Sequence, residues 1–126
     1  MTYDLVVLTR KSFNVQDIVA GMVAAGGELL VRQVADGAVI QLCDEAEQPL
    51  VAIEVPMLVQ VPGEVERVLG AIGDAPVEVP VWWMEMRAAD TDRGADLAHA
   101  FADEVAGRVG GQTWVGQPRP GEAERA

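Results

Sequence analysis

The segment AGGELLV (residues 25–31) ends one predicted helix and leads into a strand, and VGGQTWV (residues 109–115) does the same near the other end of the chain. In each case a strand, a loop and a helix precede the Gly-Gly pair. Parallel strands need a crossover connection of this kind. The two segments therefore predict two β-α-β units, in which glycine, a common helix terminator, ends each helix.

The first unit begins with a strand over residues 3–10, and both faces of this strand are apolar. Such a strand is typical of the middle of a sheet that is covered on both sides. Ser12 or Asn14 can cap the helix that follows. Its hydrophobic residues recur at helical spacing from Val15 to Val23, before Gly26-Gly27.

A hairpin and a long extended segment separate the two units. Two strand patterns, over residues 28–34 and 38–44, flank Asp36-Gly37, a dipeptide that tolerates the positive φ of a tight turn. Residues 51–61 alternate in hydrophobicity, and Pro56 makes this strand an edge strand or a bulged one. A short helix over residues 64–69 is predicted next.

The second unit has a strand over residues 77–88, a helix over residues 91–109 and a last strand over residues 112–115. The apolar positions of its first strand change parity near Pro80, which predicts a bulge or burial on both faces. Together the elements predict an α+β fold: a ferredoxin-like two-layer sandwich with an additional hairpin, a mixed sheet, and two main helices packed on one face.

Residues 1–116 are expected to form a single α+β domain, and residues 117–126 have the composition of a flexible tail or a truncated linker. Half of the 126 residues are hydrophobic, which excludes a chain that is disordered throughout, yet no apolar run is long enough to cross a membrane. No export signal is visible at the N-terminus. We therefore expect a cytoplasmic protein without a membrane partner.

The chain carries a net charge of -11, from 20 acidic and 9 basic residues. Such a surface repels the phosphates of a nucleic acid, so no nucleic-acid partner is expected. Cys43 is the only cysteine, which excludes an internal disulfide and a thiolate metal cage. No cofactor and no metal site is predicted.

Trp82 and Trp83 are neighbours on a predicted strand, so their rings must point to opposite faces of the sheet. If the helices cover one face, Trp82, Met84 and Met86 can form an apolar interaction surface on the other, for a protein partner or a homodimer. In the alternative interpretation, the segment over residues 62–73, or curling of the sheet, covers this face within the same chain.

Glu85 and Arg87 lie two residues apart on the same side of this strand, and Glu54 and Glu78 are further carboxylates in extended segments. A small enzyme could use a site at Glu85 and Arg87, although a solvated charge pair is the ordinary interpretation because no nucleophile accompanies them. Structural roles are expected for the other polar candidates: a solvated turn at Asp44, Glu45 and Glu47, a surface position for His99, and a buried, inert thiol for Cys43. No catalytic residue is predicted.

Five segments carry a family resemblance: AVIQLCD (38–44), PLV (49–51), LVQVPGE (58–64), VWW (81–83) and GGQTW (110–114). Together they resemble an uncharacterised actinobacterial family, and the likeness extends over nearly the whole chain up to Val115. The resemblance implies a gene neighbourhood of type VII secretion and an accessory role. It implies no catalytic or binding residues.

The first functional hypothesis is a non-catalytic protein-interaction domain, an accessory or adaptor that docks through a sheet face and is associated with secretion. The second is an immunity or antitoxin-like protein whose acidic turn at residues 44–47 meets a basic toxin. The enzyme at Glu85 and Arg87 ranks last, because the sequence contains no recognisable nucleophile, metal cluster or phosphate loop.

Overall fold

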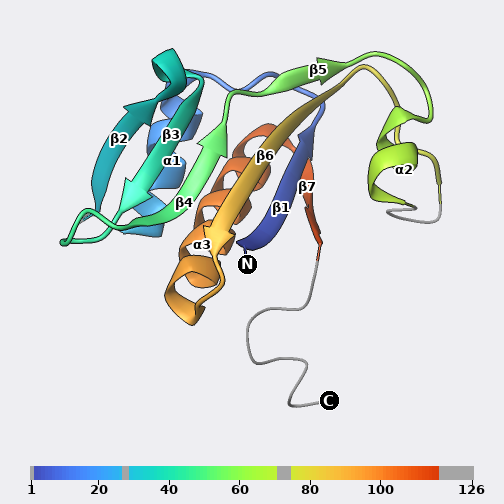
Figure 1. The fold of residues 1–126 in the computed structure, drawn as a ribbon. Coiled ribbons are helices and arrows are strands. Elements are labelled where there is room, and N and C mark those ends of the chain that lie inside the picture. Colours follow the sequence, from blue (N-terminus) through green and yellow to red (C-terminus); the bar gives the residue numbers. More distant parts are fainter. Residues whose placement is uncertain (1, 27–28, 71–74, 117–126) are drawn as a thin grey trace.

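The computed structural model describes residues 2–26, 29–70 and 75–116, and the predicted tail over residues 117–126 lies outside them. Seven strands form one sheet, in the order β2-β3-β4-β6-β1-β7 with β5 also paired to β6 (Figure 1). Their bounds are β1 (Thr2–Thr9), β2 (Leu30–Val34), β3 (Val39–Cys43), β4 (Pro49–Glu54), β5 (Met57–Val59), β6 (Val81–Ala89) and β7 (Gly111–Val115).

All the strand pairs are antiparallel, so the prediction of a mixed sheet is wrong. Both predicted β-α-β units nevertheless join strands of the same direction: in the first unit β1 and β2 are separated by three strands, β6, β4 and β3. β6 and β7 both pair antiparallel with β1, which lies between them, so they run parallel to each other without touching. Because β1 lies between β6 and β7, these two parallel strands do not hydrogen-bond to each other, and the sheet contains only antiparallel pairs.

The helices are α1 (Val15–Ala25), α2 (Glu64–Leu69) and α3 (Asp92–Val109). Figure 1 shows α1 and α3 side by side behind the sheet, as predicted, and α2 beside the end of the sheet where β5 lies. Val65 of α2 packs against the face that α1 and α3 leave open. The molecule therefore has more than the two predicted layers at this end.

The main core lies between the sheet and the long helices. Tyr3, Leu5 and Val7 of β1 are fully buried there, together with Phe101 and Val105 of α3. Burial of a large apolar side chain contributes roughly 1.5–3 kcal/mol, so this layer supplies most of the driving force for the fold.

Asn14, one of the two predicted candidates, is the N-cap of α1. Its side chain accepts a hydrogen bond from the Asp17 backbone N–H at 2.8 Å, and the Asp17 carboxylate accepts one from the Asn14 N–H at 3.1 Å. This reciprocal pair is a capping box. Thr91 caps α3 by accepting from the Gly94 N–H at 3.1 Å.

The predicted hairpin is present as β2 and β3. Its turn is a 3-10 segment, η1 (Ala35–Gly37), in which all three residues have positive φ. The predicted strand over residues 51–61 is interrupted at Val55-Pro56, so that β4 and β5 each pair with β6 separately. Proline lacks the N–H that a continuous ladder needs, which explains the break.

Of the two predicted alternatives near Pro80, β6 has no bulge, but it is buried on both faces, with Trp83 on one side and Met84 and Met86 on the other. The strand begins at Val81 and pairs with β1 without interruption from Trp82 to Ala89. Val77 and Val79 precede the strand, where they pack against the apolar cluster under α2. Their segment is tied to α2, because the Val77 N–H donates to the Glu66 carboxylate at 2.8 Å.

Candidate functional site

The side chains of β6 alternate between the two faces of the sheet. Met84 and Met86 are fully buried in the core under α1 and α3, and alternation puts Trp82 on the same side. The predicted interaction surface of Trp82, Met84 and Met86 on the helix-free face is therefore wrong. Both faces of β6 carry large apolar residues, and this composition does not reveal which face the helices cover.

Trp83 is the tryptophan on the helix-free face, and the prediction that one of the two rings must lie there is confirmed. It belongs to a second apolar cluster with Val6, Leu8, Val65 and Val81. The interpretation in which residues 62–73 cover this face is correct for the described part of that segment, since α2 contributes Val65 and Leu69. Only 7% of Trp83 is exposed.

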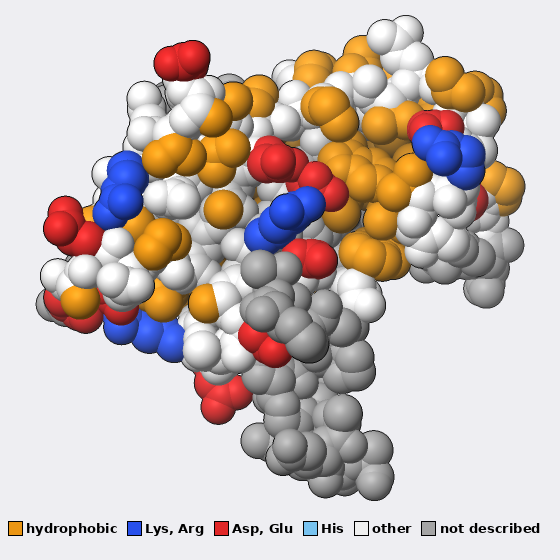
Figure 2. Space-filling model, viewed as in Figure 1, with side chains coloured by type: hydrophobic (Ala, Val, Ile, Leu, Met, Phe, Trp, Pro, Cys, Tyr) orange, Lys and Arg blue, Asp and Glu red, His pale blue; other side chains and the backbone are white. Residues whose placement is uncertain are grey.

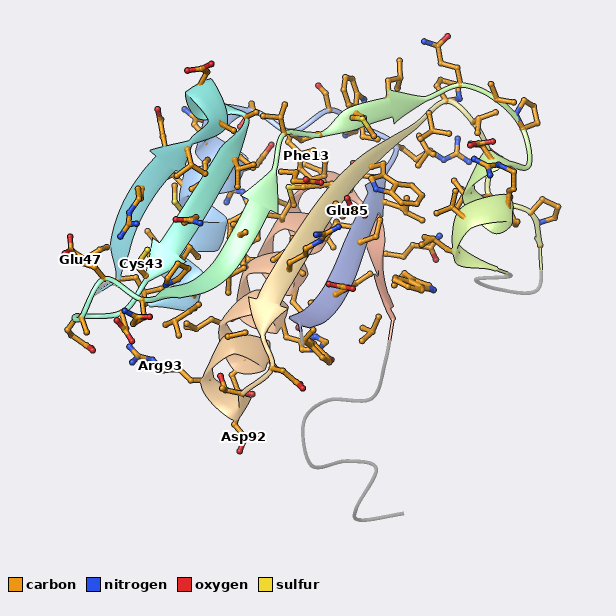
Figure 3. All side chains as sticks on the ribbon, viewed as in Figure 1. Phe13, Cys43, Glu47, Glu85, Asp92 and Arg93 are labelled. Carbon is orange, nitrogen blue, oxygen red and sulfur yellow. The ribbon has the colours of Figure 1, made fainter. Side chains whose placement is uncertain are left out.

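Charged residues occupy the middle of the same face, beyond the reach of α2. Arg87 of β6 lies opposite Asp4 of β1, and Glu85 lies opposite Val6. The β4–β6 register places Ile53 opposite Met86, so Glu54 follows at the position next to Glu85. Figure 2 shows acidic and basic side chains gathered there, beside an apolar area that extends toward α2, and Figure 3 shows Glu85 on β6.

The carboxyl groups of Glu85 and Glu54 share a hydrogen bond, which raises the pKa of Glu85 above its ordinary value. Partial burial and repulsion by the charges of Glu54 and Asp4 raise this pKa further, while Arg87 opposes the shift. The carboxyl group of Glu85 therefore retains its proton to higher pH than an isolated glutamate does.

A hollow of about 330 Å³ opens beside the carboxylate pair. Trp83, Glu85 and Glu54 form part of its wall. Val55 and Met57 also line it, and 55% and 62% of their surfaces are exposed. Its complete lining is Ala38, Val39, Glu54, Val55, Pro56, Met57, Trp83 and Glu85. The contribution of Val55 and Met57 was not predicted, although Pro56 between them signals the break that leaves both exposed.

The lining combines acidic oxygens with aliphatic, thioether and indole surface. A carboxylate pair forms strong hydrogen bonds with an ammonium or a guanidinium group. The apolar wall suits the methylene stem that carries such a group in lysine or arginine. Among the described residues no cluster of three or more acidic, cysteine or histidine side chains is arranged to hold a metal ion.

The other polar candidates lie apart from this hollow. The His99 imidazole lies 2.7 Å from the hydroxyl of buried Tyr3, so His99 is half-buried at the helix layer and is not the predicted surface residue. Cys43 is buried, as expected. In the acidic turn, Asp44 accepts two backbone N–H groups, from Ala46 and Gln48, and Glu45 pairs with Arg93 at 3.3 Å.

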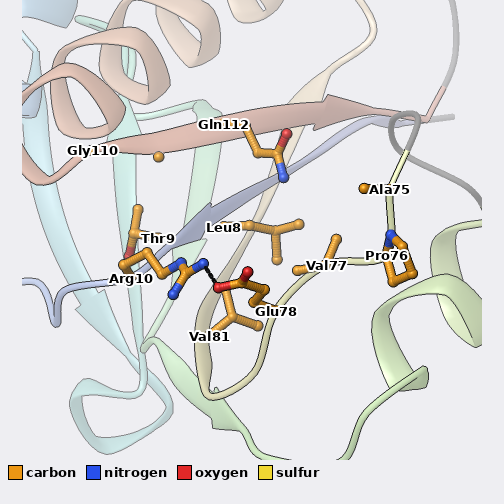
Figure 4. Close-up of a pocket in the computed structure, with 11 residues that line it drawn as sticks. Leu8, Thr9, Arg10, Ala75, Pro76, Val77, Glu78, Val81, Gly110 and Gln112 are labelled. Carbon is orange, nitrogen blue, oxygen red and sulfur yellow. Dashed lines mark hydrogen bonds and ion pairs between the residues drawn. The ribbon is translucent and has the colours of Figure 1, made fainter.

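A second hollow, of about 420 Å³, lies between the end of β1, the start of β7 and the segment before β6 (Figure 4). An ion pair between Arg10 and Glu78 spans it, and both side chains are mostly exposed. Glu78 precedes β6, which begins at Val81, and it lines a different hollow from Glu85. Because its charges neutralise each other in solvent, this hollow offers a weaker site than the one at Glu85.

No family model, curated protein or solved structure matches the chain. The actinobacterial resemblance and its link to secretion therefore remain expectations from the sequence. Among the described residues, no helix is both long and apolar enough to cross a membrane.

Proposed function

We propose that this protein is a non-catalytic protein-interaction domain, and that its helix-free sheet face binds a basic, partly apolar segment of a partner protein. The observation that carries the proposal is the carboxylate pair of Glu54 and Glu85 at the edge of a hollow lined by Trp83 and Met57. The docking face is the one expected from the adjacent tryptophans, but its residues differ from Trp82, Met84 and Met86.

The chemistry of the hollow favours a lysine or arginine side chain. Its cationic group would lie against the carboxyl groups of Glu54 and Glu85 and would favour loss of the proton from Glu85, and its stem would lie against Met57 and Trp83. A hydrogen bond to a charged group contributes about 1.5–3 kcal/mol. That contribution changes affinity by about tenfold or more, which is enough to select a basic segment over a neutral one.

The charge of the whole chain supports the same class of partner. A net charge of -11 attracts basic proteins from a distance and speeds their association, whereas an acidic partner would be repelled. Arg87 and Asp4 are neighbours across β6 and β1, so their charges offset each other and leave the carboxylate pair as the acidic centre of this face.

Two other functions receive less support. An enzyme needs reacting groups near Glu85, but the residues that line the hollow provide no hydroxyl, thiol or imidazole. For an immunity or antitoxin-like protein, the proposed acidic turn at residues 44–47 already uses Asp44 and Glu45 in contacts within the chain. A partner that binds at the hollow beside Glu54 and Glu85 would not have to break these contacts of the turn.

We also propose that the fold is an enlarged ferredoxin-like sandwich. The order β4-β6-β1-β7, with α1 after β1 and α3 after β6, supports this interpretation, and the β2–β3 hairpin extends the sheet beyond β4. In this arrangement the face opposite α1 and α3 is the natural place for a ligand, because it is open except where α2 packs on it.

The binding test uses a blocked peptide, acetyl-LKLKL-amide, labelled with a fluorophore, and its neutral counterpart acetyl-LQLQL-amide. Fluorescence anisotropy at neutral pH and low salt should give saturable binding of the lysine peptide only. The double variant Glu54→Gln/Glu85→Gln should bind it about tenfold more weakly or worse, because the amides cannot form the charged hydrogen bonds.

A matched control is Asp103→Asn/Glu104→Gln, which converts two exposed carboxylates of α3 to amides and so changes the overall charge similarly. This variant should retain the affinity of the unaltered protein. If both double variants weaken binding equally, attraction is general and the site is not at Glu85. If the lysine peptide does not bind at all, the proposed function is wrong.

A further inference from the structure

Strand β2 ends the sheet on one side, and one of its backbone edges is unpaired within the described structure. It pairs only with β3, from Leu30 opposite Cys43 to Val34 opposite Val39. Its first four residues are exposed. Natural proteins protect such edges with proline, charged side chains or a bulge, and β2 has no proline, no bulge and a single charged residue, Arg32. The free edge can therefore accept another strand.

Apolar side chains continue from this edge onto α1, which lies behind β2 and β3 in Figure 1. Val31 is 54% exposed, and Val19 and Val23 of α1 are 46% and 69% exposed. These three valines line a hollow of about 190 Å³ together with Met22, Gly26, Leu29 and Leu42. A partner that pairs with β2 would therefore also meet an apolar helix surface.

The distribution of charge points to a second copy of this chain as that partner. Within α1 and β2 the only charged residues are Asp17 and Arg32. Asp17 is 7% exposed and pairs with Arg108 at 3.2 Å. In a chain of net charge -11, two copies repel each other least where neither presents an exposed carboxylate. A basic partner, in contrast, would find no acidic group exposed along these two elements.

We propose that two copies associate through β2, which pairs antiparallel with the partner's β2 to form one continuous sheet, while the two α1 helices pack beside it. A two-fold axis at Val31 places Val31 opposite the partner's Val31, on the face that α1 covers. Leu30 then lies opposite the partner's Arg32. This register avoids the alternative in which the two arginines face each other, which like charges disfavour.

Sedimentation velocity over a range from low micromolar to near-millimolar protein tests the proposal. The unaltered protein should change from monomer to dimer as its concentration rises. Val31→Lys should raise the dimer dissociation constant by about tenfold or more, because it sets two charges against each other at the axis. Val68→Lys, at an α2 position that is 53% exposed, is the matched control and should dimerise normally.

Val23→Lys gives a second, independent variant on α1, and its exposed position means that the fold should tolerate it. Circular dichroism confirms that each variant is folded. A protein that stays monomeric at every concentration, or a dimer that survives both Val31→Lys and Val23→Lys, would overturn the proposal. The double variant Glu54→Gln/Glu85→Gln should dimerise normally, so this test is separate from the test of the binding hollow.

Discussion

The carboxyl groups of Glu54 and Glu85 share a hydrogen bond across the junction of β4 and β6, on the face of the sheet that α1 and α3 leave open. Aliphatic and aromatic side chains surround the pair, and Arg87 is the cation that lowers the pKa of Glu85 from nearby. This arrangement favours the protonated form of Glu85, and the effect on stability can be measured in the absence of any ligand.

Glu85 should make the protein less stable as pH rises. Its pKa in the folded state is raised above the ordinary value of 4.5, so its favourable contribution is present below that value and is lost as pH rises through the raised pKa. Glu85→Gln removes this loss and should increase the free energy of unfolding at neutral pH by roughly 0.2–1 kcal/mol, the range for relief of like-charge pairs across strands.

Urea denaturation of both proteins at several pH values measures this difference. The difference in the free energy of unfolding between the two proteins should vanish as pH falls below about 4, where the Glu85 carboxyl group is protonated in both the folded and the unfolded state. Glu104→Gln, at an exposed position of α3, serves as the control and should show no such pH-dependent gain. A difference in stability that is the same at every pH would contradict the raised pKa of Glu85.

Asp17 should have the opposite pH dependence. Its pKa is lowered first by the backbone hydrogen bond from Asn14 and further by Arg108, while burial opposes the shift. The stabilisation that it gives is therefore present above its ordinary pKa and is lost as pH falls through the lowered pKa. Asp17→Asn should be less stable than the unaltered protein at pH 7, and thermal melts should show the two converging in strong acid.

Gly21 allows α1 to approach α3 closely. A Cβ atom at this position would lie 2.7 Å from two ring carbons of Phe101, which is fully buried. Gly21→Ala should therefore reduce the free energy of unfolding by about 1–3 kcal/mol, the usual cost of overpacking, even though alanine favours helix. Chemical denaturation gives this value directly.

Gly107→Ala in α3 is the matched control, because a Cβ atom at position 107 would meet no neighbouring side chain or strand within 4 Å. This variant should gain stability by up to about 1 kcal/mol from helix propensity alone. If both glycine variants shift stability in the same direction, contact with Phe101 is not what fixes glycine at position 21.

Local signals in the sequence predicted much of the fold. Asn14, Thr91 and Gly110 define helix ends through contacts with residues close in sequence, so their positions could be read from residue type. Pro56 indicated an irregularity, predicted as an edge or a bulge and found as a break between β4 and β5, because its missing N–H acts at the residue itself. The β2–β3 hairpin was likewise predictable, since its turn depends on Asp36 and Gly37.

The candidate site could not be predicted in the same way, because it depends on relations between distant strands. The parity of β6 depends on where the strand begins, and Val77 and Val79 extended the apparent alternation into a segment that is not a strand. The neighbouring positions of Glu54 and Glu85 follow from the β4–β6 register. Neither relation is contained in the sequence near Glu85, so Trp82, Met84 and Met86, which lie on the helix-covered side of β6, were assigned to the helix-free docking face.

The most direct test of the account is calorimetric titration with acetyl-LKLKL-amide in buffers of different ionisation enthalpy, near the raised pKa of Glu85. If the lysine ammonium displaces the proton of Glu85, binding must release protons, and affinity must rise with pH through this range. The unaltered protein and Asp103→Asn/Glu104→Gln should show this release, and Glu85→Gln should not. Binding without proton release, or the same release from Glu85→Gln, would contradict a docking site at Glu54 and Glu85.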